Sequence, residues 1–287
     1  MFSIILYSFI SMAGIGGALA IVLYIVSQKF KVIEDPRIDE VVAILPQANC
    51  GGCGFAGCRA LAEAFVSYDD ISKLYCPVGG NSVMSEVADF LGKTIPEKDP
   101  MVAVVRCNGT HAHRPRTTVY DGATSCKIQH TLYSGDTGCQ NGCLGQGDCA
   151  RVCNFDAISI SNETGLPVID DSLCAACGAC VKSCPRCIME LRKKNAKDRK
   201  IYVSCINIEK GAVARKSCEV ACIGCGKCIK TCAHGAISIN NNLAYIDSEA
   251  CKLCRKCAND CPTGAIREIN FPVRKTEVVK EVESELV

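Results

Sequence analysis

Cysteine is the residue type in this chain whose number and spacing could do chemistry. The 287 residues include 25 cysteines, and several of them recur at fixed steps. The spacing C-x2-C-x2-C-x3-C-P occurs twice, at Cys174, Cys177, Cys180, Cys184 and Pro185, and at Cys251, Cys254, Cys257, Cys261 and Pro262. A third copy without the proline comprises Cys222, Cys225, Cys228 and Cys232. In this spacing three neighbouring thiolates hold one [4Fe-4S] cluster and the fourth reaches the next cluster.

A set of a different kind lies nearer the N-terminus. Its members, in the spacing C-x2-C-x4-C-x17-C, are Cys50, Cys53, Cys58 and Cys76. Three of them come from one glycine-rich loop, NCGGCGFAGC, whereas a zinc site usually shows two separated cysteine pairs. The set therefore predicts another iron–sulfur cluster. Apolar residues recur at three- and four-residue steps after this loop, so Cys58 is expected to open an amphipathic helix.

The downstream cysteines belong to an internal repeat. Residues 139–158 align without a gap on residues 218–237, and PVIDDSLC (167–174) resembles AYIDSEAC (244–251). The repeat predicts two ferredoxin-like modules in tandem, each of α+β type and each with room for two clusters. Paired strands are expected at 157–160 and at 236–239. A further pair of similar strands is expected just ahead of each module, at 102–108 and 201–207.

Ligand exchange within a module predicts how the thiolates are shared. In the second module, one set is expected to be Cys222, Cys225, Cys228 and Cys261, and the other Cys232, Cys251, Cys254 and Cys257. In the first module, the regular set is Cys153, Cys174, Cys177 and Cys180.

The other site of the first module is irregular, because Gln146 aligns with Cys225. It keeps Cys143, Cys149 and Cys184, and Cys139 is the candidate fourth ligand; a three-iron or otherwise unusual cluster is the alternative. Five clusters are thus expected. Of the remaining cysteines, Cys187 is expected to be inert, and a sixth cluster is conceivable at Cys107, Cys126, Cys205 and Cys218. Buried free thiols are the alternative for these four.

The element that would position all of these sites at a membrane is the N-terminal segment. Phe2 to Val26 contains no Asp, Glu, Lys or Arg and is long enough to cross a bilayer. A cleaved signal peptide is disfavoured, because no basic residue precedes the apolar run. Lys29 and Lys31 follow it, which predicts a single-pass protein of the cell (inner) membrane with the bulk of the chain in the cytoplasm. In that reducing compartment, clustered cysteines are expected to bind metal rather than form disulfides.

Composition and absent motifs exclude other classes of protein. A hydrophobic content of 48% excludes a disordered chain, and a net charge of +2 argues against a nucleic-acid partner. G-x-x-x-x-G-K-[ST] does not occur, and the G-x-G-x-x-G spacing of Gly52, Gly54 and Gly57 lies within the cysteine loop NCGGCGFAGC, so no NAD or flavin site and no catalytic residue is expected on this chain. The expected organisation is an anchor (1–28), a small helical [4Fe-4S] domain (29–95), two modules (96–190 and 191–271) and a charged tail (272–287).

The basic stretch LRKKNAKDRK (191–200) lies between the two expected modules. Because ferredoxins are commonly acidic, it could be a docking patch for such a partner, and a solvated hairpin is the alternative.

In order along the chain, an N-terminal span, the NCGGCGFAGC…CPVGG domain and the downstream ferredoxin motifs resemble the B subunits of Rnf complexes, the ion-translocating ferredoxin:NAD⁺ oxidoreductases. The resemblance covers nearly the whole chain. It implies an electron-transfer subunit that accepts electrons from reduced soluble ferredoxin and passes them to other membrane subunits of the complex. It also implies that ion transport and the reaction of NAD belong to the assembled translocase. An electron-transfer subunit of another membrane enzyme, such as a hydrogenase or a formate-oxidising complex, is the alternative.

Overall fold

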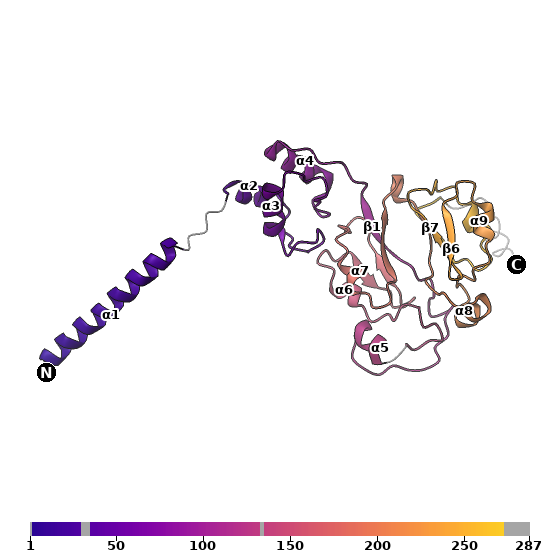
Figure 1. Cartoon of the computed structure of the whole chain (residues 1–287). Helices are drawn as coiled ribbons and strands as arrows, with labels where there is room; N and C mark the ends of the chain where they lie inside the picture. Colours follow the sequence, from indigo (N-terminus) through magenta and orange to yellow (C-terminus); the bar gives the residue numbers. More distant parts are fainter. Residues whose placement is uncertain (1, 30–34, 133–134, 273–287) are drawn as a thin grey trace.

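The computed structural model describes residues 2–29, 35–132 and 135–272. It is a mixed helix-and-strand chain, in which one long N-terminal helix is followed by a helical domain and then by two units that contain strands (Figure 1). Lys31 and, apart from Pro272, the expected charged tail lie outside the described residues.

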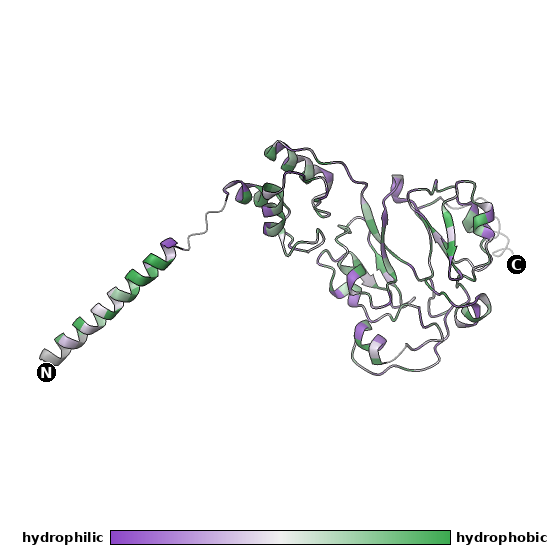
Figure 2. Ribbon diagram, viewed as in Figure 1, coloured by the Kyte–Doolittle hydropathy of each residue, from purple (hydrophilic) through white to green (hydrophobic). Residues whose placement is uncertain are grey.

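Helix α1 (Phe2–Lys29) is the apolar segment expected to be the anchor. Its stretch from Phe9 to Lys29 is, among the described residues, the one helix long and apolar enough to cross a membrane, by length and composition. The side chains described along it are exposed, and Figure 2 shows apolar colours around the helix with hydrophilic residues at its C-terminal end. A helix that is apolar all round needs an apolar environment, which a bilayer provides.

The helical domain packs α2 (Arg37–Ile44), α3 (Cys58–Ser67) and α4 (Gly80–Leu91) around a core that includes Val41, Leu61, Phe65 and Val87. Helix α3 begins at Cys58, as the periodicity predicts. Its C-terminal end is closed by the ammonium group of Lys93, which donates to the carbonyl oxygens of Phe65 and Tyr68. A cation at this end also interacts favourably with the negative end of the helix dipole, so the end of α3 is stabilised.

The first strand-containing unit has two antiparallel pairs. Strand β1 (Met101–Val105) pairs with β4 (Met189–Lys193), and β2 (Ile158–Ile160) pairs with β3 (Pro167–Ile169). The helices of this unit are α5 (Cys126–Leu132), α6 (Asp148–Arg151) and α7 (Ala179–Ser183). Strand β4 runs three residues past position 190, where a module boundary was expected.

The second unit repeats this pattern. Strand β5 (Lys200–Val203) pairs with β8 (Ile266–Ile269), and β6 (Ile237–Asn240) pairs with β7 (Leu243–Ile246). Its helices are α8 (Gly211–Ser217), α9 (Lys227–Thr231) and α10 (Lys256–Asn259), and the short helix η1 (Ala196–Asp198) connects the units. The paired strands expected at 157–160 and 236–239 are confirmed. Strands β1 and β5 are also confirmed, but each ends before the cysteine that follows it.

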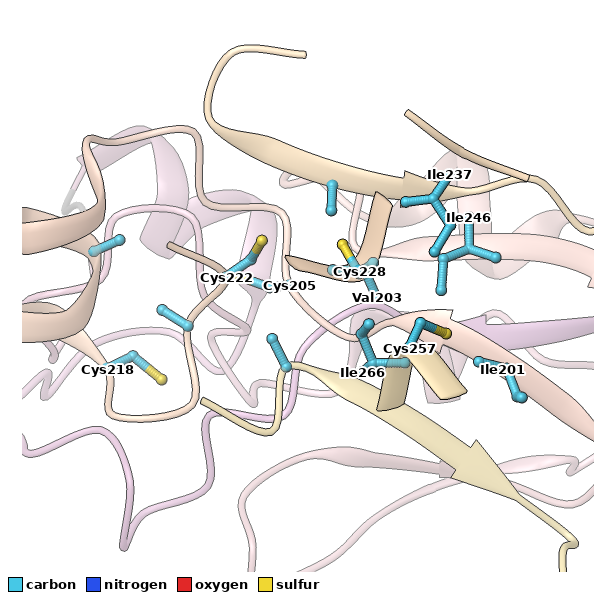
Figure 3. Packing of buried hydrophobic residues seen from close by; sticks show 14 residues of the cluster. Ile201, Val203, Cys205, Cys218, Cys222, Cys228, Ile237, Ile246, Cys257 and Ile266 are labelled. Carbon is cyan, nitrogen blue, oxygen red and sulfur yellow. The ribbon is translucent and has the colours of Figure 1, made fainter. Parts of the chain in front are cut away.

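The core of the second unit is small and contains thiols. Figure 3 shows Ile201, Val203, Ile237, Ile246 and Ile266 packed together, with the sulfur atoms of Cys228 and Cys257 beside them. Short strands with this little apolar packing give a marginal core, so a group that joins the thiols would contribute a large part of the stability.

The two units are joined through hydrogen bonds to backbone acceptors and through ion pairs such as that of Lys200 with Asp171. The Ser204 hydroxyl donates to the carbonyl oxygen of Val105 at 3.3 Å, and the Arg106 guanidinium donates to the carbonyl oxygen of Cys205 at 3.4 Å. An ion pair with Glu190 of its own unit, at 3.2 Å, holds the Arg106 side chain in place. These contacts bring the ends of β1 and β5 together.

Candidate metal centres

The second unit gathers its cysteines into two pockets, as ligand exchange predicts. One pocket is lined by Cys222, Cys225, Cys228 and Cys261, and the other by Cys232, Cys251, Cys254 and Cys257. In each pocket one thiol comes from the opposite cysteine loop. Gly224 turns the first loop with a φ of +64°, and a Cβ there would lie 2.6 Å from the carbonyl oxygen of Asn242. Only glycine fits that turn.

The regular set of the first unit is also brought together. Burial raises the pKa of the Cys180 thiol to about 12, and the neighbouring thiols of Cys174 and Cys177 add to the shift. Burial likewise raises the pKa of Cys177, with smaller effects from Cys50, Cys153 and Cys174. The thiols of Cys153, Cys174, Cys177 and Cys180 therefore share one low-dielectric region.

The irregular site of the first unit has four thiols despite Gln146, but the fourth belongs to Cys126. The pocket is lined by Cys126, Cys143, Cys149 and Cys184. Helix α5 brings Cys126 there, because Asp148 at the start of α6 accepts hydrogen bonds from the backbone N–H of Lys127 at 2.9 Å and the hydroxyl of Ser125 at 3.1 Å. Burial raises the pKa of Cys149 to about 11, with further contributions from the thiols of Cys126 and Cys184.

Cys139, which was expected in that set, lines a different pocket, together with Cys107, Cys205 and Cys218. We call this pocket the junction site, because two of its cysteines come from each strand-containing unit. Cys126 was expected here, so the structure exchanges the places of Cys126 and Cys139 in the expected groupings. Burial raises the pKa of Cys205 to about 12 and also raises the pKa of Cys139.

Repeat equivalence explains this exchange. Cys107 and Cys205 each follow the first strand of their unit, and Cys139 aligns with Cys218. Equivalent residues of two similar units meet at the junction in two pairs. Cys107 and Cys139 are 32 positions apart, whereas Cys205 and Cys218 are 13 apart, so the first unit has extra residues in this segment. Cys126 lies in this longer segment and has no equivalent in the second unit. The sequence therefore contained the signal for this grouping, because the gap-free alignment of 139–158 on 218–237 pairs Cys139 with Cys218.

The N-terminal set lines one pocket of the helical domain, made by Cys50, Cys53, Cys58 and Cys76. The side-chain oxygen of Asn49 accepts a hydrogen bond from the backbone N–H of Cys58 at 2.9 Å and so holds the loop against the start of α3. The backbone N–H of Gly79 points at the sulfur of Cys76 from 3.4 Å. Such N–H donors stabilise negative charge on cluster sulfur and help to set the reduction potential.

The chemistry of these pockets fits iron–sulfur clusters. Five of the six sets have four thiols around one pocket, yet among the described residues no three His, Cys, Asp or Glu side chains are close enough to hold a single metal ion. Backbone N–H groups approach the sulfurs in the first unit too, from Ala103 to Cys174 and from Ile188 to Cys184, both at 3.5 Å. Four thiols around a space larger than one ion, with amide donors to sulfur, are the donor set of a cluster.

The six sets are neighbours in one series. Gly52 in the loop of Cys50 packs so closely on the loop of Cys177 that a Cβ would lie 2.7 Å from the Cys177 carbonyl oxygen. The two sets of the first unit meet where Cys149 affects the pKa of Cys180. The backbone N–H of Cys143 then lies 3.5 Å from the sulfur of Cys107 in the junction site.

Beyond the junction the series continues into the second unit. Cys222 lies next to Cys205, since its backbone N–H hydrogen-bonds to that thiol and lowers the pKa that burial raises. The two sets of the second unit meet where Cys228 affects the pKa of Cys257, which burial raises to about 12. Each set thus has a neighbour on the path from the helical domain to α10.

Two other sequence expectations can be compared with the structure. Cys187 is exposed and has a φ of 51°, at the place where the second unit has Gly264. The basic stretch 191–200 is neither an open patch nor a hairpin. It comprises the end of β4, η1 and the start of β5, and its Arg192 and Lys200 are buried in ion pairs with Glu190 and Asp171.

Known families match three parts of the chain. Residues 45–72 match an Fe-S cluster family, residues 167–186 a 4Fe-4S binding domain, and residues 221–265 a 4Fe-4S dicluster domain. These segments contain most of the N-terminal set, the Cys174 loop and both cysteine loops of the second unit. The chain is therefore an iron–sulfur protein with ferredoxin-type domains.

Similar proteins cover most of the chain. It is 45% identical over 230 residues to the B subunit of the Na(+)-translocating ferredoxin:NAD(+) oxidoreductase complex of Acetobacterium woodii, which covers 80% of this chain and 68% of that protein. It is 41% identical over 253 residues to the B subunit of the ion-translocating oxidoreductase complex of Methanosarcina acetivorans, with 88% and 93% covered. For the B subunit of the proton-translocating ferredoxin:NAD(+) oxidoreductase complex of Clostridium ljungdahlii, the identity is 37% over 237 residues, with 83% and 82% covered. The chain belongs to the family of Rnf complex B subunits, and it is a membrane-associated iron–sulfur electron-transfer subunit of such a complex.

Proposed function

We propose that this subunit carries electrons through six [4Fe-4S] clusters, from soluble ferredoxin at the second strand-containing unit to membrane partners at the helical domain. The observation that carries the proposal is the unbroken series of neighbouring four-thiol sets from Cys254 to Cys50. When bound, each cluster supplies one-electron redox chemistry with little rearrangement of its ligands. The thiols of the chain would hold the clusters and keep them close together.

The proposed ligands follow the observed pockets. The two strand-containing units are two tandem ferredoxin-like modules, and each would hold two clusters. The repeated pairing of β1 with β4 and of β5 with β8 supports this division. A fifth cluster belongs to the helical domain of residues 29–95, and a sixth belongs to the junction site. Cys126 completes the irregular set, and Cys139 belongs to the junction.

The proposed membrane arrangement is a single span made by α1, with the modules in the cytoplasm. Lys29 at the C-terminal end of α1 supports this orientation, since basic residues flank spans on the cytoplasmic side. Protease added to sealed inverted vesicles should then cleave the modules, whereas protection of the modules would reverse the orientation.

A docking surface for the donor is proposed around α9 and α10. Cys225 and Cys254 are exposed ligands at the two sets of the second unit. Four exposed lysines lie in the same helices and loops: Lys227, Lys230, Lys252 and Lys256. In the first unit, Asp148 and Arg151 align with Lys227 and Lys230. Asp148 and Arg151 form an ion pair with each other, so the first unit lacks the two lysine charges at these places. Positive charge beside exposed ligands suits an acidic redox protein, and the names of two relatives include ferredoxin.

The nucleotide reaction is assigned to a partner subunit. The sequence contains no G-x-x-x-x-G-K-[ST] motif, and its G-x-G-x-x-G spacing at Gly52, Gly54 and Gly57 belongs to the loop of the N-terminal cysteine set, so the chain would deliver electrons to a subunit that handles NAD. This chain would then lack a substrate-transforming site of its own.

Iron and acid-labile sulfide in the anaerobically prepared full chain test the cluster count. About 24 iron atoms per chain are expected for six clusters, and about 20 would leave the junction site without one. Stoichiometric zinc with little sulfide would contradict the relay.

The docking surface has a separate test. Reversal of the four lysine charges to glutamate should weaken the apparent affinity for reduced ferredoxin at least tenfold at low salt and flatten its salt dependence. The matched control reverses Lys127 and Lys182, two exposed lysines of the first unit. Equal effects of both variants would show that the donor binds elsewhere.

A further inference from the structure

A buried arginine lines the junction site. Arg114 is 6% exposed and lines the pocket of Cys107, Cys139, Cys205 and Cys218. A Cβ built on Gly109 would lie 3.2 Å from the sulfur of Cys218 and 3.4 Å from Cδ of Arg114, so the arginine and this sulfur pack on the same glycine. Its charge favours the thiolate forms of Cys139 and Cys218, although burial is the main influence on their pKa and raises it.

Within the described part of the chain, Arg114 has no carboxylate partner at ion-pair distance, and its buried Nε has no hydrogen-bond acceptor. A guanidinium group keeps its charge at every physiological pH. A buried cation without a counter-charge is strongly unfavourable. The site therefore lacks a negative group, and a thiolate-ligated cluster is negative in both of its oxidation states.

A second buried arginine lies on the same side of the junction. Arg186 is 8% exposed and donates to the backbone carbonyl oxygens of Cys139 and Gly142. It lines the neighbouring pocket of Cys143 and lies close enough to Arg114 for each charge to affect the other. In the second unit the equivalent residue, next to the Cys-Pro pair, is the neutral Thr263. Burial of two cations here is thus specific to the junction side of the first unit.

The electrostatic consequence concerns reduction. Reduction adds one electron, and so one negative charge, to a site whose four cysteines are all buried. Burial opposes this added charge, and by itself it would make the junction cluster hard to reduce. A neighbouring guanidinium stabilises the more negative form in the same low-dielectric region.

We propose that Arg114, with a smaller contribution from Arg186, raises the reduction potential of a cluster at Cys107, Cys139, Cys205 and Cys218, and so keeps this buried site able to pass electrons between the two modules. The proposal rests on the sixth cluster proposed above. Arg114 is a positioning residue: it would place a positive charge beside the cluster without binding it. One electron enters from one neighbouring site and one leaves to the other, and no bond is formed or broken.

The pockets of Cys50 and of Cys222 provide an internal comparison, because no charged residue lines either of them. Arg106 also lines the junction pocket, but its charge is paired with Glu190 at 3.2 Å. Arg114 is therefore the cation of the junction pocket whose charge a cluster would have to balance.

The test is a redox titration of the full chain, loaded with clusters and followed by electron paramagnetic resonance. In Arg114→Gln, one cluster should become at least tenfold harder to reduce, which is 59 mV for a one-electron couple. The other midpoints should remain unchanged. Arg114→Lys should keep that midpoint closer to the unmodified value. Arg116→Gln is the matched control, because Arg116 is exposed and pairs with Asp136 at 3.1 Å.

Iron content separates failure of this inference from failure of the cluster assignment. A chain that binds about 20 iron atoms and in which Cys218→Ser changes no cluster signal has no junction cluster. If the cluster is present in Arg114→Gln with an unchanged midpoint, the role of Arg114 is refuted. If Arg114→Gln does not load the cluster, Arg114→Lys decides: a loaded cluster with a near-normal midpoint supports the role of charge. Failure of both variants to load it would make Arg114 a structural residue and overturn the proposal.

Discussion

Cys107 and Cys205, which follow equivalent strands of two similar units, line the same pocket between those units. Repetition of one unit has thus produced a site that neither unit contains alone. It also links the pairs of pockets on either side, because Cys107 lies next to Cys143 and Cys205 lies next to Cys222.

The exchange of Cys126 and Cys139 predicts which cysteine variants act on the same site. Cys126→Ser and Cys184→Ser should affect one cluster, so the double variant should lose only about four iron atoms. Cys139→Ser combined with Cys184→Ser should perturb two clusters. Iron analysis and the spectra of three-iron centres distinguish these patterns. Cys187→Ser is the control, because Cys187 is exposed and should leave iron content unchanged.

The contact of Gly52 with Cys177 predicts a defect in transfer between the helical domain and the first module. In Gly52→Ala, the new Cβ would meet the Cys177 carbonyl oxygen at 2.7 Å, so the two loops must separate at a cost of about 1–3 kcal/mol. Iron content should stay normal while reduction of the Cys50 cluster slows in stopped-flow mixing. Gly138→Ala, whose Cβ would have its nearest neighbour at 3.9 Å, should behave like the unmodified chain. Equal rates in the two variants would show that this contact does not control transfer.

Glu190 should stabilise the packing between the two units by neutralising two arginines. It pairs with Arg106 at 3.2 Å and Arg192 at 3.1 Å and accepts a hydrogen bond from the Tyr245 hydroxyl at 2.8 Å. Glu190→Gln leaves the buried Arg192 charge uncompensated and should destabilise the chain by about 2 kcal/mol. Tyr245→Phe removes one hydrogen bond and should cost about 1 kcal/mol.

Thermal unfolding of the cluster-loaded chain measures both effects. Glu163→Gln, at an exposed position of the β2–β3 turn, is the control and should change stability by less than about 0.5 kcal/mol. A Glu190→Gln variant as stable as this control would show that solvent already screens the two arginine charges.

Helix α1 should contribute membrane attachment and little else. Its described side chains are exposed, so removal of residues 1–29 deletes none of the core residues that the structure describes. The truncated chain should keep its iron content and unfolding temperature but remain in the supernatant when membranes are sedimented. A truncated chain that still sediments with membranes would reveal a second attachment surface.

The sequence by itself determined the cysteine sets that are local. A loop such as Cys222 to Cys232 brings its thiols together through spacing and glycine turns, so its contacts depend on neighbouring residues alone. The same holds for Cys50, Cys53 and Cys58, and for the helix that begins at Cys58. The repeat also predicted that Cys261 and Cys232 each line the pocket of the other cysteine loop, because the two equivalent loops of one module face each other.

Only the tertiary structure decided the contacts that depend on distant segments. Cys126 reaches its pocket because Asp148 binds the start of α5, and Cys139 reaches the junction because two units pack with their equivalent ends together. The basic stretch has the composition of an open surface, yet Arg192 and Lys200 are buried against Glu190 and Asp171. Charge pairing and the meeting of repeated units are set by packing between segments, which spacing along one chain does not specify.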